Sequence, residues 1–106
     1  MAATTDDLVF FTARTTDGNS TAYPMSFPNR KGQLDVYGTF DGCTVTLQYS
    51  PDGGTTYVTA RDASYSDISF TANGSIAIEA PLGELLRCAV TNDGASTSIT
   101  AKLKVI

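Results

Sequence analysis

The chain has 106 residues, 42% of them hydrophobic and 17% charged, a length and composition that predict one globular domain. Seven basic and eleven acidic residues give a net charge of −4, which disfavours DNA or RNA as a partner because nucleic-acid affinity depends on neutralising phosphates. The sequence has no histidine and no tryptophan, so it lacks the commonest general base and metal ligand. We therefore expect no catalytic residue, no metal site and no cofactor.

The first seven residues are small, polar or acidic, and we expect residues 1–7 to be a flexible arm or to become ordered only against a partner. Residues 8–106 are predicted to form the single domain. The apolar run Leu8 to Phe11 is too short for the hydrophobic segment of a signal peptide or for a membrane span, and acidic residues precede it. We therefore expect synthesis in the cytoplasm and no membrane partner.

The first predicted strand is Leu8–Arg14, and apolar side chains fall on both of its faces. Phe10 lies on one face and Phe11 on the other, so we expect the strand to be covered twice. Within a monomer the second cover would be a loop or another layer. In an oligomer the face that carries Phe11 is a candidate interface.

After a turn-rich stretch at residues 15–20, the segment from Tyr23 to Pro28 alternates large apolar side chains with two prolines and a serine. Because prolines remove ladder donors, this pattern predicts an edge strand or an extended loop. Its apolar side chains either form a lid under the sandwich or face a partner, and two cations in the next turn suit an acidic surface. The candidate partner-contact residues are Phe11, Tyr23, Met25, Phe27, Arg30 and Lys31.

The stretch from Gln33 to Tyr57 alternates apolar and polar residues, which predicts two strands joined at Asp41-Gly42 and a third strand after a turn at residues 51–54. Asp-Gly between alternating runs predicts a hairpin, because both central residues of a type I′ turn need positive φ. Similar sequences predict hairpins at residues 73–74 and 92–94. The residues expected to build the turns are Asp41, Gly42, Asp52, Gly53, Gly54, Asn73 and Gly74.

The remaining segments continue the same alternation, at residues 56–61, 68–71, 76–78, 86–91 and 99–105. None has a helical period. About eight strands separated by turns predict an all-β fold, an antiparallel β-sandwich that is immunoglobulin-like or jelly-roll-like.

The two cysteines, Cys43 and Cys88, fall on the apolar side of predicted strands and could face each other across the core. A disulfide there would stabilise the chain by about 4 kcal/mol in the chain-entropy model. A reducing compartment favours the other alternative, two small buried thiols.

Residues 50–57, SPDGGTTY, resemble the Asp-box Ser-x-Asp-x-Gly-x-Thr-Trp of sialidases and other β-proteins, with Tyr57 in place of the usual Trp. In those families the box is a structural hairpin that recurs around a propeller. One copy on a chain of this length does not imply sialidase activity. A calcium site at Asp52 has little support, because this cation takes about 6 to 8 oxygen ligands.

GTFDGCTVTLQ, residues 38–48, followed by SPDGGTTY, resembles small virion proteins of tailed bacteriophages, particularly those that decorate or cement the capsid exterior. The similarity spans roughly Leu34 to Val58 and, less distinctly, the Thr-rich C-terminal segment. It implies an all-β domain, often a trimer at local threefold positions, that binds the major capsid protein and stabilises the shell against the pressure of the DNA. It also implies a place on the outside of the virion, and it brings no catalytic residue.

The alternative is a small carbohydrate-binding or host-adhesion module, since small sandwiches bind sugars on aromatic platforms. Tyr37, Tyr49 and Tyr57 could serve, but they lie in or beside predicted strands, where packing is the better interpretation. A small hydrolase has the least support, because no nucleophile with an adjacent base is recognisable.

Overall fold

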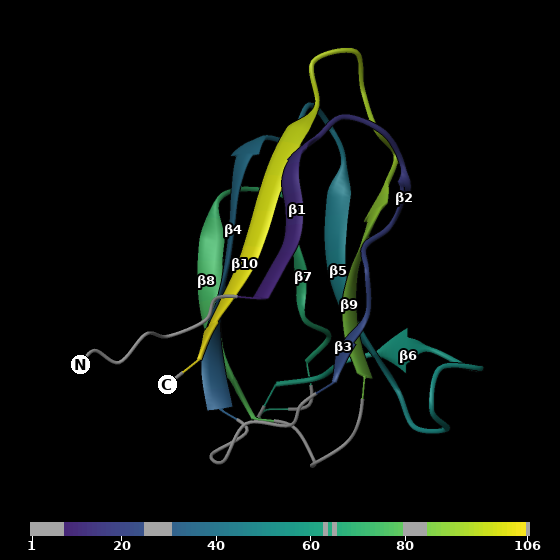
Figure 1. Cartoon of the computed structure of the whole chain (residues 1–106). Coiled ribbons are helices and arrows are strands. Elements are labelled where there is room, and N and C mark those ends of the chain that lie inside the picture. The colour runs from purple at the N-terminus through teal and green to yellow at the C-terminus, as the bar shows by residue number, and fades with distance from the viewer. Residues whose placement is uncertain (1–7, 25–30, 63, 65, 80–84, 106) are drawn as a thin grey trace.

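The computed structural model describes residues 8–24, 31–62, 64, 66–79 and 85–105, which form two antiparallel sheets packed face to face (Figure 1). Sheet 1 has four strands in the order β1 (Leu8–Arg14), β10 (Ser98–Val105), β4 (Lys31–Thr39) and β8 (Gly74–Glu79).

Sheet 2 is built around two long central strands that pair with each other, β5 (Thr44–Ser50) and β9 (Leu85–Thr91). On its other side, each central strand pairs with two short strands instead of one continuous strand. The short strands beside β9 are β2 (Gly18–Asn19) and β3 (Tyr23–Pro24). Those beside β5 are β6 (Val58–Thr59) and β7 (Ser69–Phe70).

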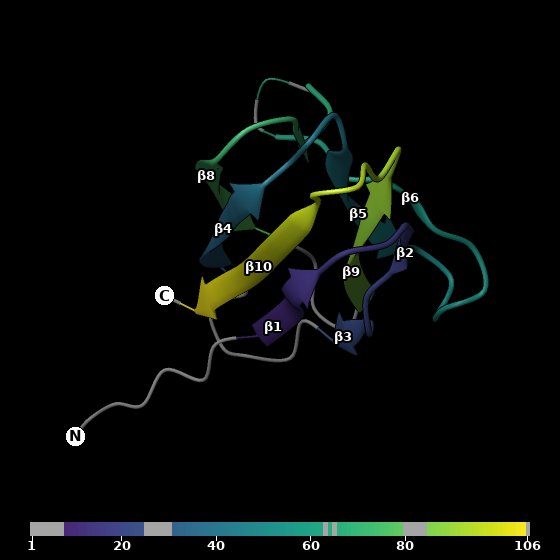
Figure 2. The same cartoon turned by 90° about the horizontal axis from the view of Figure 1, so that it is seen from above.

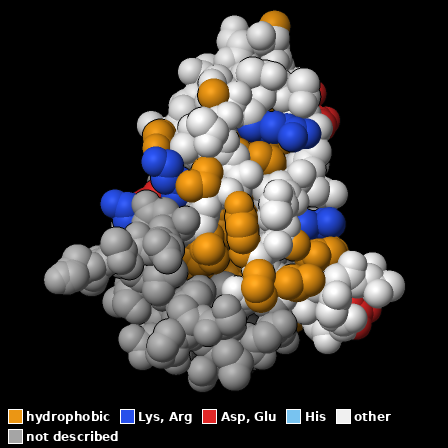
Figure 3. Space-filling model, in the orientation of Figure 1, with side chains coloured by type: hydrophobic (Ala, Val, Ile, Leu, Met, Phe, Trp, Pro, Cys, Tyr) orange, Lys and Arg blue, Asp and Glu red, His pale blue; other side chains and the backbone are white. Residues whose placement is uncertain are grey.

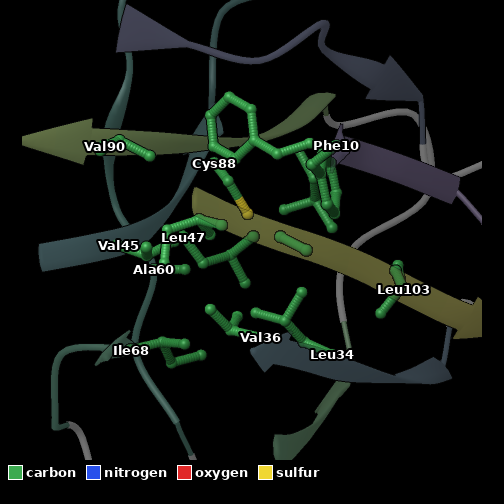
Figure 4. Close-up of a cluster of buried hydrophobic side chains, with 14 of the residues drawn as sticks. Phe10, Leu34, Val36, Val45, Leu47, Ala60, Ile68, Cys88, Val90 and Leu103 are labelled. Atoms are coloured by element: carbon green, nitrogen blue, oxygen red, sulfur yellow. The ribbon is translucent and has the colours of Figure 1, made fainter. Parts of the chain in front are cut away.

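The core lies between the sheets, where the apolar members of each alternating strand meet (Figure 4). In β4 and β5, apolar residues buried toward the core alternate with more exposed polar ones over most of each strand, as the period of two predicts. The side chains with no more than 2% exposure are Leu34, Val36, Cys43, Val45, Leu47, Leu86, Cys88, Val90, Ile99, Ala101 and Leu103, with the polar Ser50 and Thr97. The predicted all-β antiparallel sandwich is therefore confirmed, and no helix occurs in the part of the chain that the structure describes.

The number of strands is ten among the described residues, against about eight expected. The expected strand at residues 56–61 shrinks to β6, and the turn-rich stretch at 15–20 contains the unexpected β2. Strands of two residues carry too little alternation to be recognised in a sequence.

The predicted hairpin at Asp41-Gly42 is wrong in its pairing, although its turn forms. Asp41 and Gly42 have φ of 48° and 86°, and the Cys43 N–H donates to the Phe40 carbonyl over 2.9 Å. However, β4 belongs to sheet 1 and β5 to sheet 2. Phe40 and Cys43 both point into the core, so the chain crosses from one sheet to the other at this turn (Figure 2).

The hairpins expected at residues 73–74 and 92–94 are corrected in the same way. β7 and β8 lie in different sheets, and so do β9 and β10. Among the expected turns only residues 51–54 join two strands that pair, because β5 pairs with β6 at Gln48↔Thr59 and Tyr49↔Val58. The connections are therefore mostly links between the sheets.

The first strand also departs from simple alternation. Phe10 and Phe11 are adjacent, yet both are buried, with 6% and 4% exposure. A register shift between Val9 and Phe11 against β10 marks a bulge, which turns consecutive side chains toward the same side. Phe11 thus joins the core of its own chain, and the expectation that it faces a partner is corrected.

The two cysteines are free and buried. Cys88 lies opposite Leu47, and Cys43 is four residues before Leu47 in the sequence. At about 3.3 Å per residue that offset is about 13 Å, whereas a disulfide spans a Cα separation of at most about 7 Å. The geometry therefore matches the alternative of two buried thiols. Among the described residues no helix is long and apolar enough to cross a membrane.

Candidate functional site

The hairpin between β5 and β6 is fixed by the side chains of Ser50 and Asp52. Asp52 Oδ1 accepts hydrogen bonds from the Thr55 N–H (3.1 Å), the Thr56 N–H (2.8 Å) and the Ser50 hydroxyl (2.9 Å). Ser50 Oγ in turn accepts from the Gly54 N–H over 2.7 Å. Because Ser50 is only 1% exposed, this network anchors an exposed loop to the edge of the core.

These bonds also lower the pKa of Asp52. The Thr56 backbone N–H, together with the Thr56 and Ser50 side chains, lowers the pKa of Asp52 to about 2. The shift is opposite to the one that a general acid acting on a glycosidic bond needs, because such an acid needs a raised pKa. Gly53 and Gly54, with φ of 80° and 113°, supply the left-handed backbone of the turn.

Tyr57, at the aromatic position of the Asp-box-like segment, is covered by a cation. The Arg87 guanidinium carbon lies 3.6 Å from the centroid of the Tyr57 ring, and Arg87 Nε donates to Gln48 Oε1 over 2.8 Å. Arg87 and Gln48 are cross-strand partners on β9 and β5. The stack ties the base of the hairpin to sheet 2, and it occupies one face of the Tyr57 ring.

The sequence prediction missed Arg87 and Gln48. The alternation in residues 86–91 places Arg87 on the polar phase of its strand, and this was the only available signal. Its contact with Tyr57 depends on the pairing of β5 with β9, which brings together segments about 40 residues apart in the chain.

Tyr23 joins the two sheets on the side of the sandwich where β1 and β3 lie. Its ring meets the Phe10 ring edge-on, with centroids 5.6 Å apart and planes at 64°, and its hydroxyl donates to the Val9 carbonyl over 2.9 Å. Since Tyr23 lies in β3 of sheet 2 and Val9 in β1 of sheet 1, the side chain closes the sandwich there. For Tyr23 the structure matches the lid alternative.

A hydrophobic area surrounds this junction. Figure 3 shows apolar side chains gathered over the lower ends of β1 and β3. Val9 is 37% exposed on β1, and Tyr23 is half-buried. Three of the expected contact residues, Met25, Phe27 and Arg30, lie outside the described residues. Lys31 is the first residue of β4 and lies opposite Glu79. The structure describes the backbone of Lys31 but not its side chain.

The other expected turn residues bond to the backbone at links between the sheets. Asp41 Oδ2 accepts from the Ser96 N–H over 2.8 Å, which ties the β4–β5 link to the β9–β10 link. Asn73 Oδ1 accepts from the Gly38 N–H over 2.9 Å, which ties the β7–β8 link to the end of β4. These polar side chains hold the ends of the sandwich together.

The three tyrosines considered as a sugar platform differ in exposure. Tyr49 is half-buried against the core, and Tyr57 lies under Arg87. Tyr37 is 42% exposed on the outer side of sheet 1. They do not form one aromatic surface, because Tyr37 belongs to sheet 1 and Tyr49 to sheet 2.

Comparison with protein-family models, with curated protein sequences and with solved structures finds no match to this chain.

Proposed function

We propose that the chain is a non-enzymatic virion structural protein of a tailed bacteriophage, which binds the major capsid protein on the outside of the shell and stabilises the shell. The proposal starts from the resemblance of residues 34–58 to capsid decoration proteins. The structural observation that supports the proposal best is the hydrogen bonding within the hairpin from Ser50 to Tyr57. Its only carboxylate, on Asp52, is committed to the backbone of its own turn.

The hairpin is a projecting element, as both views of the ribbon show for β6 and the loop before it (Figures 1 and 2). Residues 51–56 are exposed, and the Ser50–Asp52 network and the Arg87–Tyr57 stack hold them in place. A rigid projection loses little conformational entropy on docking, which favours binding by shape.

The capsid contact is proposed to include Phe27, Arg30 and Lys31, together with the hydrophobic area beside Tyr23. In the sequence, large apolar residues are followed closely by two cations, a combination that suits a partner surface with apolar and acidic groups. On the virion the protein is proposed to act as a homo-oligomer, with a trimer as the state that the resemblance implies. After synthesis in the host cytoplasm it would assemble onto the capsid exterior.

Co-sedimentation with undecorated capsids of the phage that encodes the chain tests the proposal. We expect saturable binding, and weaker binding for Phe27→Ala and Arg30→Glu with the melting temperature unchanged. Thr71→Ala, an exposed change between β7 and β8, is the control that should bind like the parent. Parent protein that stays wholly in the supernatant would refute capsid binding.

One observation favours the second candidate, a carbohydrate-binding or host-adhesion module. The exposed Tyr37 ring on the outer side of sheet 1 is accessible for stacking against a sugar. This alternative predicts that the protein binds glycans on an array and that Tyr37→Ala abolishes this binding. Capsid binding that is unaffected by Tyr37→Ala would separate the two functions.

A further inference from the structure

The two sheets have four outer edges, and three of them are interrupted. Both edges of sheet 2 consist of two-residue strands, β2 and β3 on one side and β6 and β7 on the other. The β1 edge of sheet 1 has two register shifts against β10, and Ala13 within it has φ of 51°. Short strands and bulges of this kind prevent another strand from pairing along an edge.

The fourth edge, β8, is regular. It pairs with β4 over six consecutive positions without a register shift, from Lys31↔Glu79 to Val36↔Gly74. It contains no proline, and residues 74–78 carry no charge. No described strand pairs with its other side. In an antiparallel ladder every second residue of such a strand directs its N–H and C=O outward, so β8 presents a row of backbone donors and acceptors.

The side chains of β8 suit pairing with an identical strand. Ile76 and Ile78 are half-buried against the core, whereas Ser75 and Ala77 are small and exposed on the outer side of the sheet. If two β8 strands run antiparallel with Ala77 opposite Ala77, Ile76 of each copy faces Ile78 of the other. Ser75 then lies opposite Glu79, so no like charges are opposed.

We propose that β8 is a self-association edge, which pairs antiparallel with β8 of a second copy around a twofold axis at Ala77. The two four-stranded sheets then become one continuous sheet of eight strands, and the isoleucines at the rim of each core cover one another. The interface is isologous, so it closes at two copies and does not extend into a fibre. It does not require capsid binding. It does replace the trimer that the resemblance implies with a dimer, so the two oligomeric states are alternatives.

Sedimentation velocity over micromolar to millimolar concentrations tests this interface. The parent is expected to be dimeric, and Ala77→Lys and Ala77→Glu are each expected to be monomeric, because like charges would face each other at the axis. An equal mixture of the two variants should recover the dimer. Thr12→Lys, at an exposed position on the interrupted β1 edge, is the matched control and should stay dimeric.

Circular dichroism and melting temperature establish that each variant is folded. A parent that stays monomeric at all concentrations overturns the proposal, and so does a folded Ala77→Lys that associates like the parent. A trimer that is insensitive to both charges at Ala77 overturns it as well, and places self-association on another surface.

Discussion

At the scale of single residues, the polar side chains of this protein act mainly on the backbone. Asp52 binds two successive N–H groups of its own turn, Asp41 binds the N–H of Ser96, and Asn73 binds that of Gly38. Ser20 Oγ similarly accepts from the Cys88 N–H over 2.9 Å. Side chains used in this way determine the course of the loops, so their substitution is expected to change stability first.

The charge of Asp52 gives a prediction about pH. Its pKa is lowered from 3.8 to about 2 in the folded chain, mainly by the Thr56 backbone hydrogen bond. A lowered pKa stabilises the fold above the unfolded value, and this contribution is lost as the pH falls through the folded value. We expect the melting temperature of Asp52→Asn to lie below that of the parent at neutral pH and the difference to shrink between about pH 4 and pH 2.

Melting curves of both proteins, recorded by circular dichroism across this range, provide the measurement. The difference between the two proteins isolates Asp52 from the other carboxylates, which titrate in both. A difference that stays constant down to pH 2 would mean that the ionised carboxylate does not stabilise the turn.

Gly42 provides a second test at a single position. Its φ is 86°, and a Cβ added there would meet nothing within 4 Å, so the only cost of a side chain is the backbone conformation. We expect Gly42→Val to lower the free energy of unfolding by about 1–2 kcal/mol. Urea denaturation measures this cost, and Thr39→Val, at an exposed strand position, is the control. Equal stability of Gly42→Val and the parent would contradict the turn geometry.

Positive φ could be predicted at two of the expected turns, where the preference is local, but not at Ala13, and Asn73-Gly74 lacks the positive φ that its sequence indicates. Asp41, Gly42, Gly53 and Gly54 all have positive φ where the turn sequences indicate it. The Arg87–Tyr57 stack could not be predicted, because it requires the register between β5 and β9. Phe11 was misplaced for a related reason, since a bulge breaks the alternation on which the prediction depended.

At the scale of elements, the fold depends on what happens after each turn. The pair Asp41-Gly42 reverses the chain as a hairpin would, yet the next strand joins the other sheet. A turn sequence specifies two or three φ angles and says nothing about which strand will be the neighbour. Pairing is determined by the burial of Phe40 and Cys43 and by contacts with strands far along the chain. Alternation therefore predicted the strands well and their partners poorly.

Tyr23 connects two elements from different sheets, and this gives a prediction for β3. Tyr23→Phe keeps the ring against Phe10 but removes the hydrogen bond to the Val9 carbonyl, so we expect a loss of about 1 kcal/mol in unfolding free energy. Tyr23→Ala also removes the ring contact and is expected to cost about 2–3 kcal/mol. Urea denaturation of both variants ranks the two contributions. Two variants as stable as the parent would show that Tyr23 is not part of the lid, and would return it to the candidate partner contacts.

At the scale of the whole molecule, apolar side chains of alternating strands form the core of the sandwich. The hydrogen-bonded polar side chains described above lie in the links and loops at its ends and edges. Its buried thiols are inaccessible, and burial raises the pKa of both Cys43 and Cys88, so neither forms a reactive thiolate easily. Three surface features of the described residues have been considered as contacts with other proteins: the rigid β5–β6 hairpin, the hydrophobic area beside Tyr23 and the regular β8 edge. All three suit binding to another protein surface.

We propose that this binding stabilises a capsid, so the temperature at which capsids release their DNA should rise when the protein is bound. Filled capsids that lack the protein would be heated with and without the purified chain, and DNA release would be followed with a dye that cannot enter intact shells. We predict release at a higher temperature when the protein is bound, with saturation at a fixed number of copies per shell. Release at the same temperature with saturating protein present would contradict the account.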